Sequence, residues 1–146
     1  MRTVADVEVG QLLPARTVHV DRARLVQYAG ASLDRNPIHW DERFATSVGL
    51  PDVIAHGMWT MGAAGTVVTD WCGDAGRVLS YSAKFAAPVV VPYDGGADVE
   101  ITGKVTKVDA QTGEVTVELA ATCRGEKVLG RTVAVVRLDT AAADGA

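Results

Sequence analysis

Asp34 and His39 are the residues of this sequence whose types and spacing best suit proton transfer. They lie five positions apart, and Asn36 and Pro37 stand between them. Proline fixes φ at about −65° and disfavours helix in the residue before it, so this segment is expected to form a rigid turn. A rigid turn can hold the carboxyl and imidazole groups at one site.

An Asp and a His that converge on one water suit a reaction in which a proton leaves one carbon while hydroxide leaves its neighbour. One group acts as base, the other acts as acid, and the reverse step restores both. No cofactor is then required. The spacing alone leaves a structural alternative open, in which Asp34 forms a turn and His39 is a hydrogen-bonded structural residue, because such residues are common in loops.

Two short helices are expected to flank this turn. The first covers Arg22–Ala29, with Gly30 closing its end. The second covers Asp41–Val48 and has acidic residues in its first turn. Asp41 and Glu42 therefore fit a helix N-terminus better than a metal site, and no metal ligands are expected there.

A third helix is expected over Met58–Trp71, a segment that is apolar nearly all round and has small residues from Gly62 to Gly65. Each glycine costs about 1 kcal/mol of helix propensity relative to alanine, so another element should approach this helix closely. The apolar segment contains Asp70 and is shorter than the roughly 20 residues that cross a bilayer. It predicts a buried core helix and no membrane span.

Four strands are expected after the third helix. Apolar and polar residues alternate in the middle two, as is typical of half-buried antiparallel strands, and hairpin turns separate the last three. Helices in the first half and hairpins in the second predict an α+β domain, with one large antiparallel sheet against the apolar helix. The expected strands are Val78–Ala86, Ala97–Val108, Glu114–Cys123 and Lys127–Leu138.

The composition is that of an ordinary globular protein, with 48% hydrophobic and 22% charged residues among 146. One domain is expected over residues 1–138 and a loose tail over 139–146. The net charge of −4 argues against a nucleic-acid-binding protein, which needs a concentrated basic surface. Cys72 and Cys123 show no zinc or disulfide pattern and no secretory signal is evident, so a reducing cytoplasm fits best.

Two motifs resemble those of a known enzyme family. The first runs from Tyr28 through Ser32, Asp34 and Asn36 to His39, and the second covers residues 55–58, Ala-His-Gly-Met. Together they resemble the hydratase motif of the MaoC-like dehydratases and (R)-specific enoyl hydratases. Residues 36–41, 48–50 and 54–62 are most similar to catalytic subunits of the (3R)-hydroxyacyl carrier-protein dehydratases of long-chain fatty-acid elongation.

This resemblance covers almost the whole chain in the order of its elements. It implies the hot-dog fold, in which a curved antiparallel sheet wraps a central helix. It also implies reversible hydration and dehydration of 2-enoyl and (3R)-hydroxyacyl thioesters, with Asp34 and His39 as the pair that positions the water. Gly57 matches the glycine whose backbone N–H polarises the thioester carbonyl, since a helix N-terminus offers unpaired donors to the enolate oxygen.

Three further residues are expected at the substrate site. Asn36 should orient the loop or the water. Ser32 should form a hydrogen bond near the site, although it could equally bond its own helix end. His56, next to the oxyanion glycine, is expected to have a capping or structural role, because the resemblance places proton transfer on His39.

Leu33 departs from the family pattern, in which glycine commonly stands between the Ser and the Asp. Leucine would be strained at a position that requires φ > 0, so the loop is expected to use ordinary dihedrals or a different path. The aromatic residues Trp40, Trp59 and Trp71 could line an acyl tunnel, but such residues beside a central helix are more often core.

Two other functions stay open at this stage. The hot-dog fold also occurs in acyl thioesterases, and the chain could be a non-catalytic partner subunit of a heterodimeric dehydratase. The thioester could be carried by coenzyme A or a carrier protein, through a local basic patch of Lys84, Arg124, Lys127 and Arg131. A single curved sheet leaves unpaired edges, so a homodimer or a heterodimer with a second hot-dog subunit is expected.

Overall fold

The chain folds as an antiparallel sheet with helices on one face, and the computed structural model describes residues 2–140. The five strands are ordered β1-β3-β4-β5-β2, and all neighbours pair antiparallel. The strands are β1 (Arg16–Val20), β2 (Val78–Ser82), β3 (Ala97–Asp109), β4 (Glu114–Cys123) and β5 (Glu126–Arg137). The helices are η1 (Val4–Asp6), α1 (Arg22–Ser32), η2 (Pro37–His39), α2 (Glu42–Ser47), α3 (Gly57–Cys72) and η3 (Ala75–Arg77).

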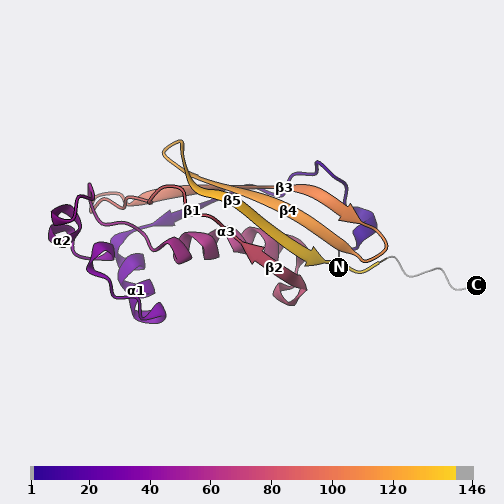
Figure 1. Ribbon diagram of the computed structural model, residues 1–146, viewed down its shortest axis with the longest axis horizontal. Helices are drawn as coiled ribbons and strands as arrows, with labels where there is room; N and C mark the ends of the chain where they lie inside the picture. Colours follow the sequence, from indigo (N-terminus) through magenta and orange to yellow (C-terminus); the bar gives the residue numbers. More distant parts are fainter. Residues whose placement is uncertain (1, 141–146) are drawn as a thin grey trace, which may run out of the picture.

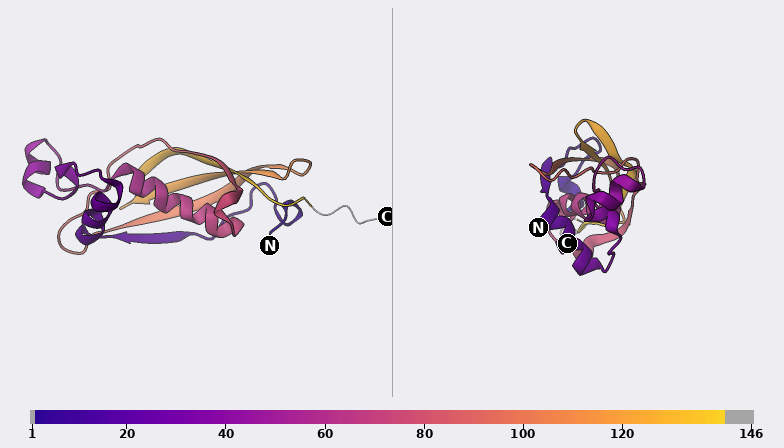
Figure 2. Two further views of the ribbon diagram at one scale, coloured as in Figure 1. Left: turned by 90° about the horizontal axis from the view of Figure 1, so that it is seen from below. Right: turned by 90° about the vertical axis from the view of Figure 1, so that its left-hand side faces the viewer.

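Helix α3 lies along the concave side of the sheet, and α1 and α2 extend from one end of the molecule (Figure 1). Seen from that end, the sheet curls around the helix (Figure 2). This arrangement confirms the predicted α+β hot-dog fold. Within residues 2–140, no helix is both long and apolar enough to cross a membrane.

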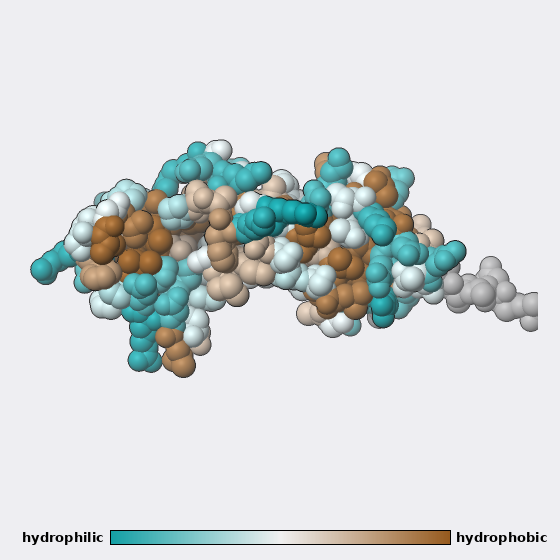
Figure 3. Space-filling view, viewed as in Figure 1, coloured by the Kyte–Doolittle hydropathy of each residue, from teal (hydrophilic) through white to brown (hydrophobic). Residues whose placement is uncertain are grey.

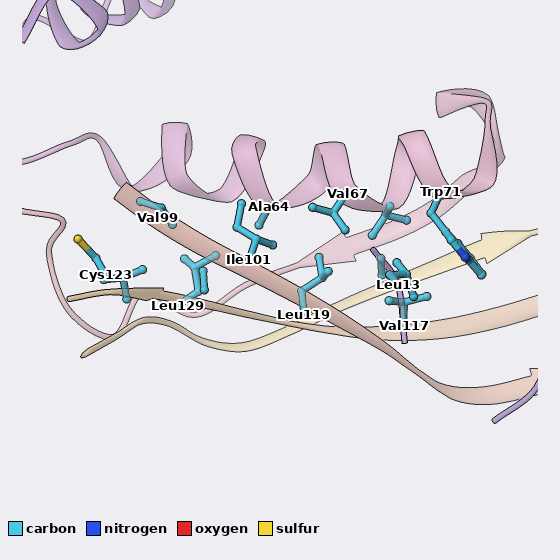
Figure 4. Close-up of a cluster of buried hydrophobic side chains, with 14 of the residues drawn as sticks. Leu13, Ala64, Val67, Trp71, Val99, Ile101, Val117, Leu119, Cys123 and Leu129 are labelled. Atoms are coloured by element: carbon cyan, nitrogen blue, oxygen red, sulfur yellow. The ribbon is translucent and has the colours of Figure 1, made fainter. Parts of the chain in front are cut away.

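The core forms where alternate residues of β3 meet α3. Val99, Ile101 and Val105 are fully buried, while Glu100, Thr102 and Lys104 on the other face are exposed. Ala64 and Val67 of α3 belong to the same cluster of buried side chains (Figure 4). Burying each of the larger side chains stabilises the fold by about 1.5–3 kcal/mol, so the period-2 pattern of the sequence determines which face holds the helix.

The small residues of α3 allow a close approach by β2. A Cβ at Gly65 would lie 3.1 Å from the Tyr81 ring, and the Tyr81 hydroxyl donates to the Met61 carbonyl at 2.6 Å. A Cβ at Gly62 would meet no atom within 4 Å. The expected close contact is therefore made at Gly65 and not at Gly62.

The end of α1 differs from the prediction. The helix continues past Gly30 to Ser32, and Leu33 takes the left-handed C-cap conformation with φ 63° and ψ 9°. The expectation of ordinary dihedrals at Leu33 is therefore wrong. Its side chain is 70% exposed, so the backbone can take this turn without placing the leucine against a neighbour.

Two further boundaries are corrected. The strand expected over Val78–Ala86 ends at Ser82, after which contact with β5 continues only as irregular bonds and an isolated bridge between Phe85 and Leu129. The tail expected from residue 139 onward is not loose at Asp139, which bridges to Thr3 and forms an ion pair with Arg77. Residues 141–146 lie outside the described part of the chain.

Candidate active site

The turn that carries Asp34 begins where α1 ends. Ser32 Oγ donates to the Tyr28 carbonyl at 2.8 Å and accepts from the Asp34 N–H at 3.2 Å. Together with the left-handed Leu33, these bonds turn the chain sharply away from the helix axis. Ser32 thus has the helix-end contacts that the sequence left as an alternative to a role at the substrate site.

Asn36 organises the second half of the turn. Its side-chain oxygen accepts from the Ile38 N–H at 3.2 Å, and its own N–H donates to Asp34 Oδ1 at 3.2 Å. Pro37 then begins the short helix η2, which ends at His39. These contacts are those of a residue that orients the loop, and Asn36 does not line the cavity into which Asp34 and His39 project.

His39 is buried, and its ring nitrogens have different partners. Nδ1 lies 2.7 Å from the Ile54 carbonyl oxygen. A carbonyl only accepts, so the proton of the neutral ring is on Nδ1 and Nε2 carries a lone pair. Nε2 lies 3.9 Å from Asp34 Oδ2, and the Asp34 side chain is 54% exposed. This separation is too long for a direct hydrogen bond and allows one water to contact both groups.

The surroundings of His39 favour its neutral form. Burial is the main cause that lowers its pKa from the ordinary 6.5, and the neighbouring His56 ring lowers it further. The bond to Ile54 and the charge of Asp34 act in the opposite direction without overcoming burial. A neutral His39 has its Nε2 lone pair available to accept a proton.

His56 packs directly on His39. The two rings stack with centroids 3.7 Å apart and planes 20° apart, and the Tyr28 ring lies 4.8 Å from His56 on a tilted plane. His56 Nε2 donates to the Asp34 carbonyl at 3.0 Å, whereas its buried Nδ1 has no hydrogen-bond partner. The residue holds the N-cap position of α3 through its backbone alone, since its side chain makes no capping bond.

These groups open into one cavity of about 640 Å³. Gly57, the first residue of α3, contributes to its wall, and a helix N-terminus leaves its first N–H groups without partners inside the helix. A Cβ at Gly57 would lie 2.9 Å from the Phe85 ring, so glycine lets the aromatic wall approach the helix start. The cavity is lined by Tyr28, Ser32, Asp34, His39, Ile54, Ala55, His56, Gly57, Met58, Thr60, Phe85, Ala86, Ala87, Pro88, Val89, Val128 and Leu129.

The cavity wall contains residues that the sequence did not single out for a role at the site. Tyr28 lies one helical turn before Ser32, and this spacing could have indicated it. Phe85 lies three residues beyond the end of β2 and continues the alternation of apolar and polar residues that begins at Leu79, so this pattern could have indicated it. None of the three tryptophans lines the cavity: Trp71 is buried core, Trp59 packs against the core, and Trp40 is 48% exposed.

A metal ion is a second chemistry that these side chains could support in principle. Donor atoms of Asp34, His39 and His56 lie within 4.8 Å of one another. However, one nitrogen of each ring donates to a backbone carbonyl, and the remaining nitrogen of His56 is buried. That leaves Asp34 and one nitrogen of His39, which is fewer than the three protein ligands of a typical zinc enzyme.

The sequence matches the MaoC like domain family over residues 6–123. A 3-hydroxyacyl-thioester dehydratase X from Mycobacterium tuberculosis is 39% identical over 83 residues, which are 57% of this chain and 29% of that protein. An (R)-specific enoyl-CoA hydratase from Rhodospirillum rubrum is 32% identical over 117 residues, which are 79% of this chain and 80% of that protein. The chain thus spans less than a third of the first relative and most of the second.

Solved structures show the same fold. A MaoC-like dehydratase superposes with a TM-score of 0.92 at 43% identity, over 94% of this chain and 42% of that chain. A chain of the ChsH1–ChsH2 complex from Mycobacterium tuberculosis superposes with a TM-score of 0.76 at 25% identity, over 89% and 98% of the two chains. The segment that carries Asp34, His39 and Gly57 lies inside the matched region in sequence.

Proposed function

Because the chain belongs to the MaoC-like domain family, we propose that it is a hydro-lyase that reversibly adds water to 2-enoyl thioesters to give (3R)-hydroxyacyl thioesters. One observation carries the proposal: the unprotonated Nε2 of His39 lies 3.9 Å from the Asp34 carboxylate at the wall of an apolar cavity. A water between them contacts a base and an acceptor at once. No cofactor is needed for this chemistry.

In the hydration direction, His39 Nε2 accepts a proton from the water while the water oxygen bonds to C3. Asp34 accepts a hydrogen bond from the second O–H of the same water, which stays on the oxygen, and so fixes the orientation of the water. The electrons of the double bond move toward the thioester carbonyl, and the proton then passes to C2. One water has been added across the double bond, and His39 is neutral again for the next turnover.

The oxygen of the enolate needs a donor while the proton is in transit. We assign this role to the backbone N–H of Gly57, which adds the partial positive charge of the α3 N-terminus. The apolar wall of the cavity, including Met58, Phe85 and Leu129, then contacts the acyl chain.

The direct test is an assay of the purified chain with a series of 2-enoyl thioesters. Hydration removes the enoyl-thioester absorbance without releasing a free thiol, whereas a hot-dog thioesterase releases the thiol. Thiol release in step with substrate loss would overturn the proposed reaction in favour of hydrolysis. A chain that binds these thioesters without converting them would be the non-catalytic subunit.

The carrier of the acyl group is tested in the same assay by supplying it on coenzyme A and on a carrier protein. Lys127 and Arg131 share a surface hollow with Lys104, and the backbone of Lys84 bonds to Arg131. Arg124 instead donates to two backbone carbonyls. We therefore propose that the β5 part of the expected basic patch binds the phosphate groups of either carrier.

We propose the reducing cytoplasm as the location of the protein, because Cys72 and Cys123 are buried and form no disulfide.

We also propose that the working unit is a dimer of two hot-dog units. The sheet order leaves β1 and β2 at open edges. Exposed apolar side chains occur in and after β2, at Leu79 and Phe85, and in and after α2, at Phe44 and Val48. In Figure 3 hydrophobic patches lie both near the end that carries α2 and near β2. Light scattering with activity on the same peak separates an active homodimer from a chain that needs a second hot-dog subunit.

A further inference from the structure

We infer that His56 is a positioning residue, which acts through His39 and Asp34 and takes no part in proton transfer itself. The inference rests on the proposed hydration reaction. It assigns two separate functions to one ring: a hydrogen bond that holds the Asp34 loop, and a stacked face that shields His39 from solvent.

The hydrogen bond joins two parts of the site that are far apart in sequence. His56 Nε2 donates to the Asp34 carbonyl at 3.0 Å, across 22 residues of chain. His56 also directly precedes Gly57 at the start of α3. The bond therefore fixes the distance between the loop that orients the water and the backbone donor proposed for the enolate oxygen. A displacement of about 1 Å between such groups can cost on the order of 100-fold in rate.

The stacked face of the His56 ring shields His39, the proposed base. The His56 ring lies parallel to His39 at 3.7 Å and is itself only 2% exposed, so it covers one side of the imidazole. Burial is the main cause that lowers the His39 pKa. The titratable groups that face the pair are Asp34 from the turn and Tyr28 from α1.

The protonation of His56 is restricted by its own contacts. The Asp34 carbonyl requires a proton on Nε2, and Nδ1 is enclosed without a partner. With Nε2 bonded to a backbone carbonyl and Nδ1 enclosed, neither ring nitrogen of His56 is placed to exchange a proton with the substrate. This geometry excludes His56 as the acid of the reaction.

Two substitutions separate the two functions. His56→Gln places an amide N–H near the position of Nε2 and keeps the bond to Asp34, but it removes the aromatic face. His56→Phe keeps the face and removes the donor. We expect His56→Phe to lower kcat about 10- to 100-fold, with KM and the acid limb of the kcat/KM profile nearly unchanged. We expect His56→Gln to keep kcat within a few-fold and to move the acid limb toward pH 6.5.

A residue that only filled space would give the opposite pattern. Both variants would then lower thermal stability, while kcat per folded molecule and the acid limb stayed at the wild-type values, and this result would overturn the inference. Wild-type protein without activity toward any enoyl thioester would instead remove the proposed reaction.

Nitrogen NMR of histidine-labelled wild-type protein tests the inference without any activity. It should show that the neutral His39 ring carries its proton on Nδ1 and that the neutral His56 ring carries its proton on Nε2. Assignment of each ring follows from the loss of its signals in the His39→Ala and His56→Phe variants. A neutral His56 ring with its proton on Nδ1 would also overturn the inference, because Nε2 could not then donate to the Asp34 carbonyl.

Discussion

The turn between Tyr28 and His39 is held by hydrogen bonds, whereas the core between α3 and the sheet is held by buried apolar side chains. In the turn, Ser32, Asp34 and Asn36 each bond to backbone two to four residues away. In the core, residues far apart in sequence meet through apolar side chains, and the Tyr81 hydroxyl adds a polar contact to the Met61 carbonyl. Changes in the turn should therefore alter chemistry, and changes in the core should alter stability.

The largest effect is expected from the acid–base pair. Asp34→Asn and His39→Ala should each lower turnover by about 10²- to 10⁴-fold, because each removes one of the two groups that contact the water. The fold should persist, as judged by circular dichroism, because neither side chain belongs to the apolar core.

A second Asp–His pair in the same chain supplies the control for these variants. His19 and Asp98 lie 2.7 Å apart on β1 and β3, are exposed, and do not line the cavity. The same substitutions at His19 and Asp98 should leave turnover unchanged. Near-normal activity of folded Asp34→Asn or His39→Ala protein would show that the proton transfer is made elsewhere.

The next largest fall in turnover is expected when the backbone N–H donor of Gly57 is removed. Gly57→Pro lacks the N–H, and loss of one such donor typically lowers turnover by about 10²- to 10³-fold. Proline is tolerated at the first position of a helix, so α3 should still form. Gly57→Ala is the control, because it meets the same Phe85 ring but keeps the N–H. Equal turnover of the two variants would place the enolate oxygen against another donor.

On the core side of the comparison, Ile101→Ala should lower the free energy of unfolding by about 2–5 kcal/mol, because Ile101 is fully buried between β3 and α3. Ile101→Val should cost only about 0.5–1.5 kcal/mol. Urea denaturation measures both. Activity per folded molecule should stay at the wild-type value, and a large fall in kcat of the folded variant would show that the core and the turn are coupled.

The pH dependence of activity tests the environment of the base. Burial lowers the His39 pKa below 6.5, so the neutral, active form persists to lower pH than for an exposed histidine. The value of kcat/KM for hydration should therefore be constant through pH 6.5 and fall about tenfold per unit only below the lowered pKa. An acid limb centred above 6.5 would contradict a neutral, buried base.

The turn and the core differ in how much of their structure the sequence predicts. The alternation in residues 97–108 and 114–123 predicted β3 and β4 to within a residue, because one buried face imposes period 2. Asp34 and His39 were predicted as the site pair because the Asn-Pro turn between them is rigid and because their motif resembles that of the dehydratase family. The contacts of His39 to Ile54 and His56 could not be predicted, since they form only when η2 packs on the start of α3.

At Leu33 the backbone conformation could not be predicted from the residue type alone. The family pattern has glycine here, and the sequence alone suggested that leucine would make the loop avoid a positive φ. The chain instead adopts φ 63° with leucine in place. The hydrogen bonds of Ser32 and Asp34 on either side determine this turn, and they outweigh the local preference of one residue.

The smallest effect is therefore expected at this position. A non-glycine residue in the left-handed region costs roughly 1–2 kcal/mol, and glycine removes that strain but adds about 0.5–1 kcal/mol of unfolded-state entropy. Leu33→Gly should stabilise the protein by no more than about 1.5 kcal/mol, measured by urea denaturation. Leu33→Ala keeps the strain and removes only an exposed side chain, so it should match the wild type. If Leu33→Ala is instead clearly destabilising, the leucine side chain makes a stabilising contact. If Leu33→Gly is less stable than Leu33→Ala, the positive φ at this position carries no strain that glycine relieves.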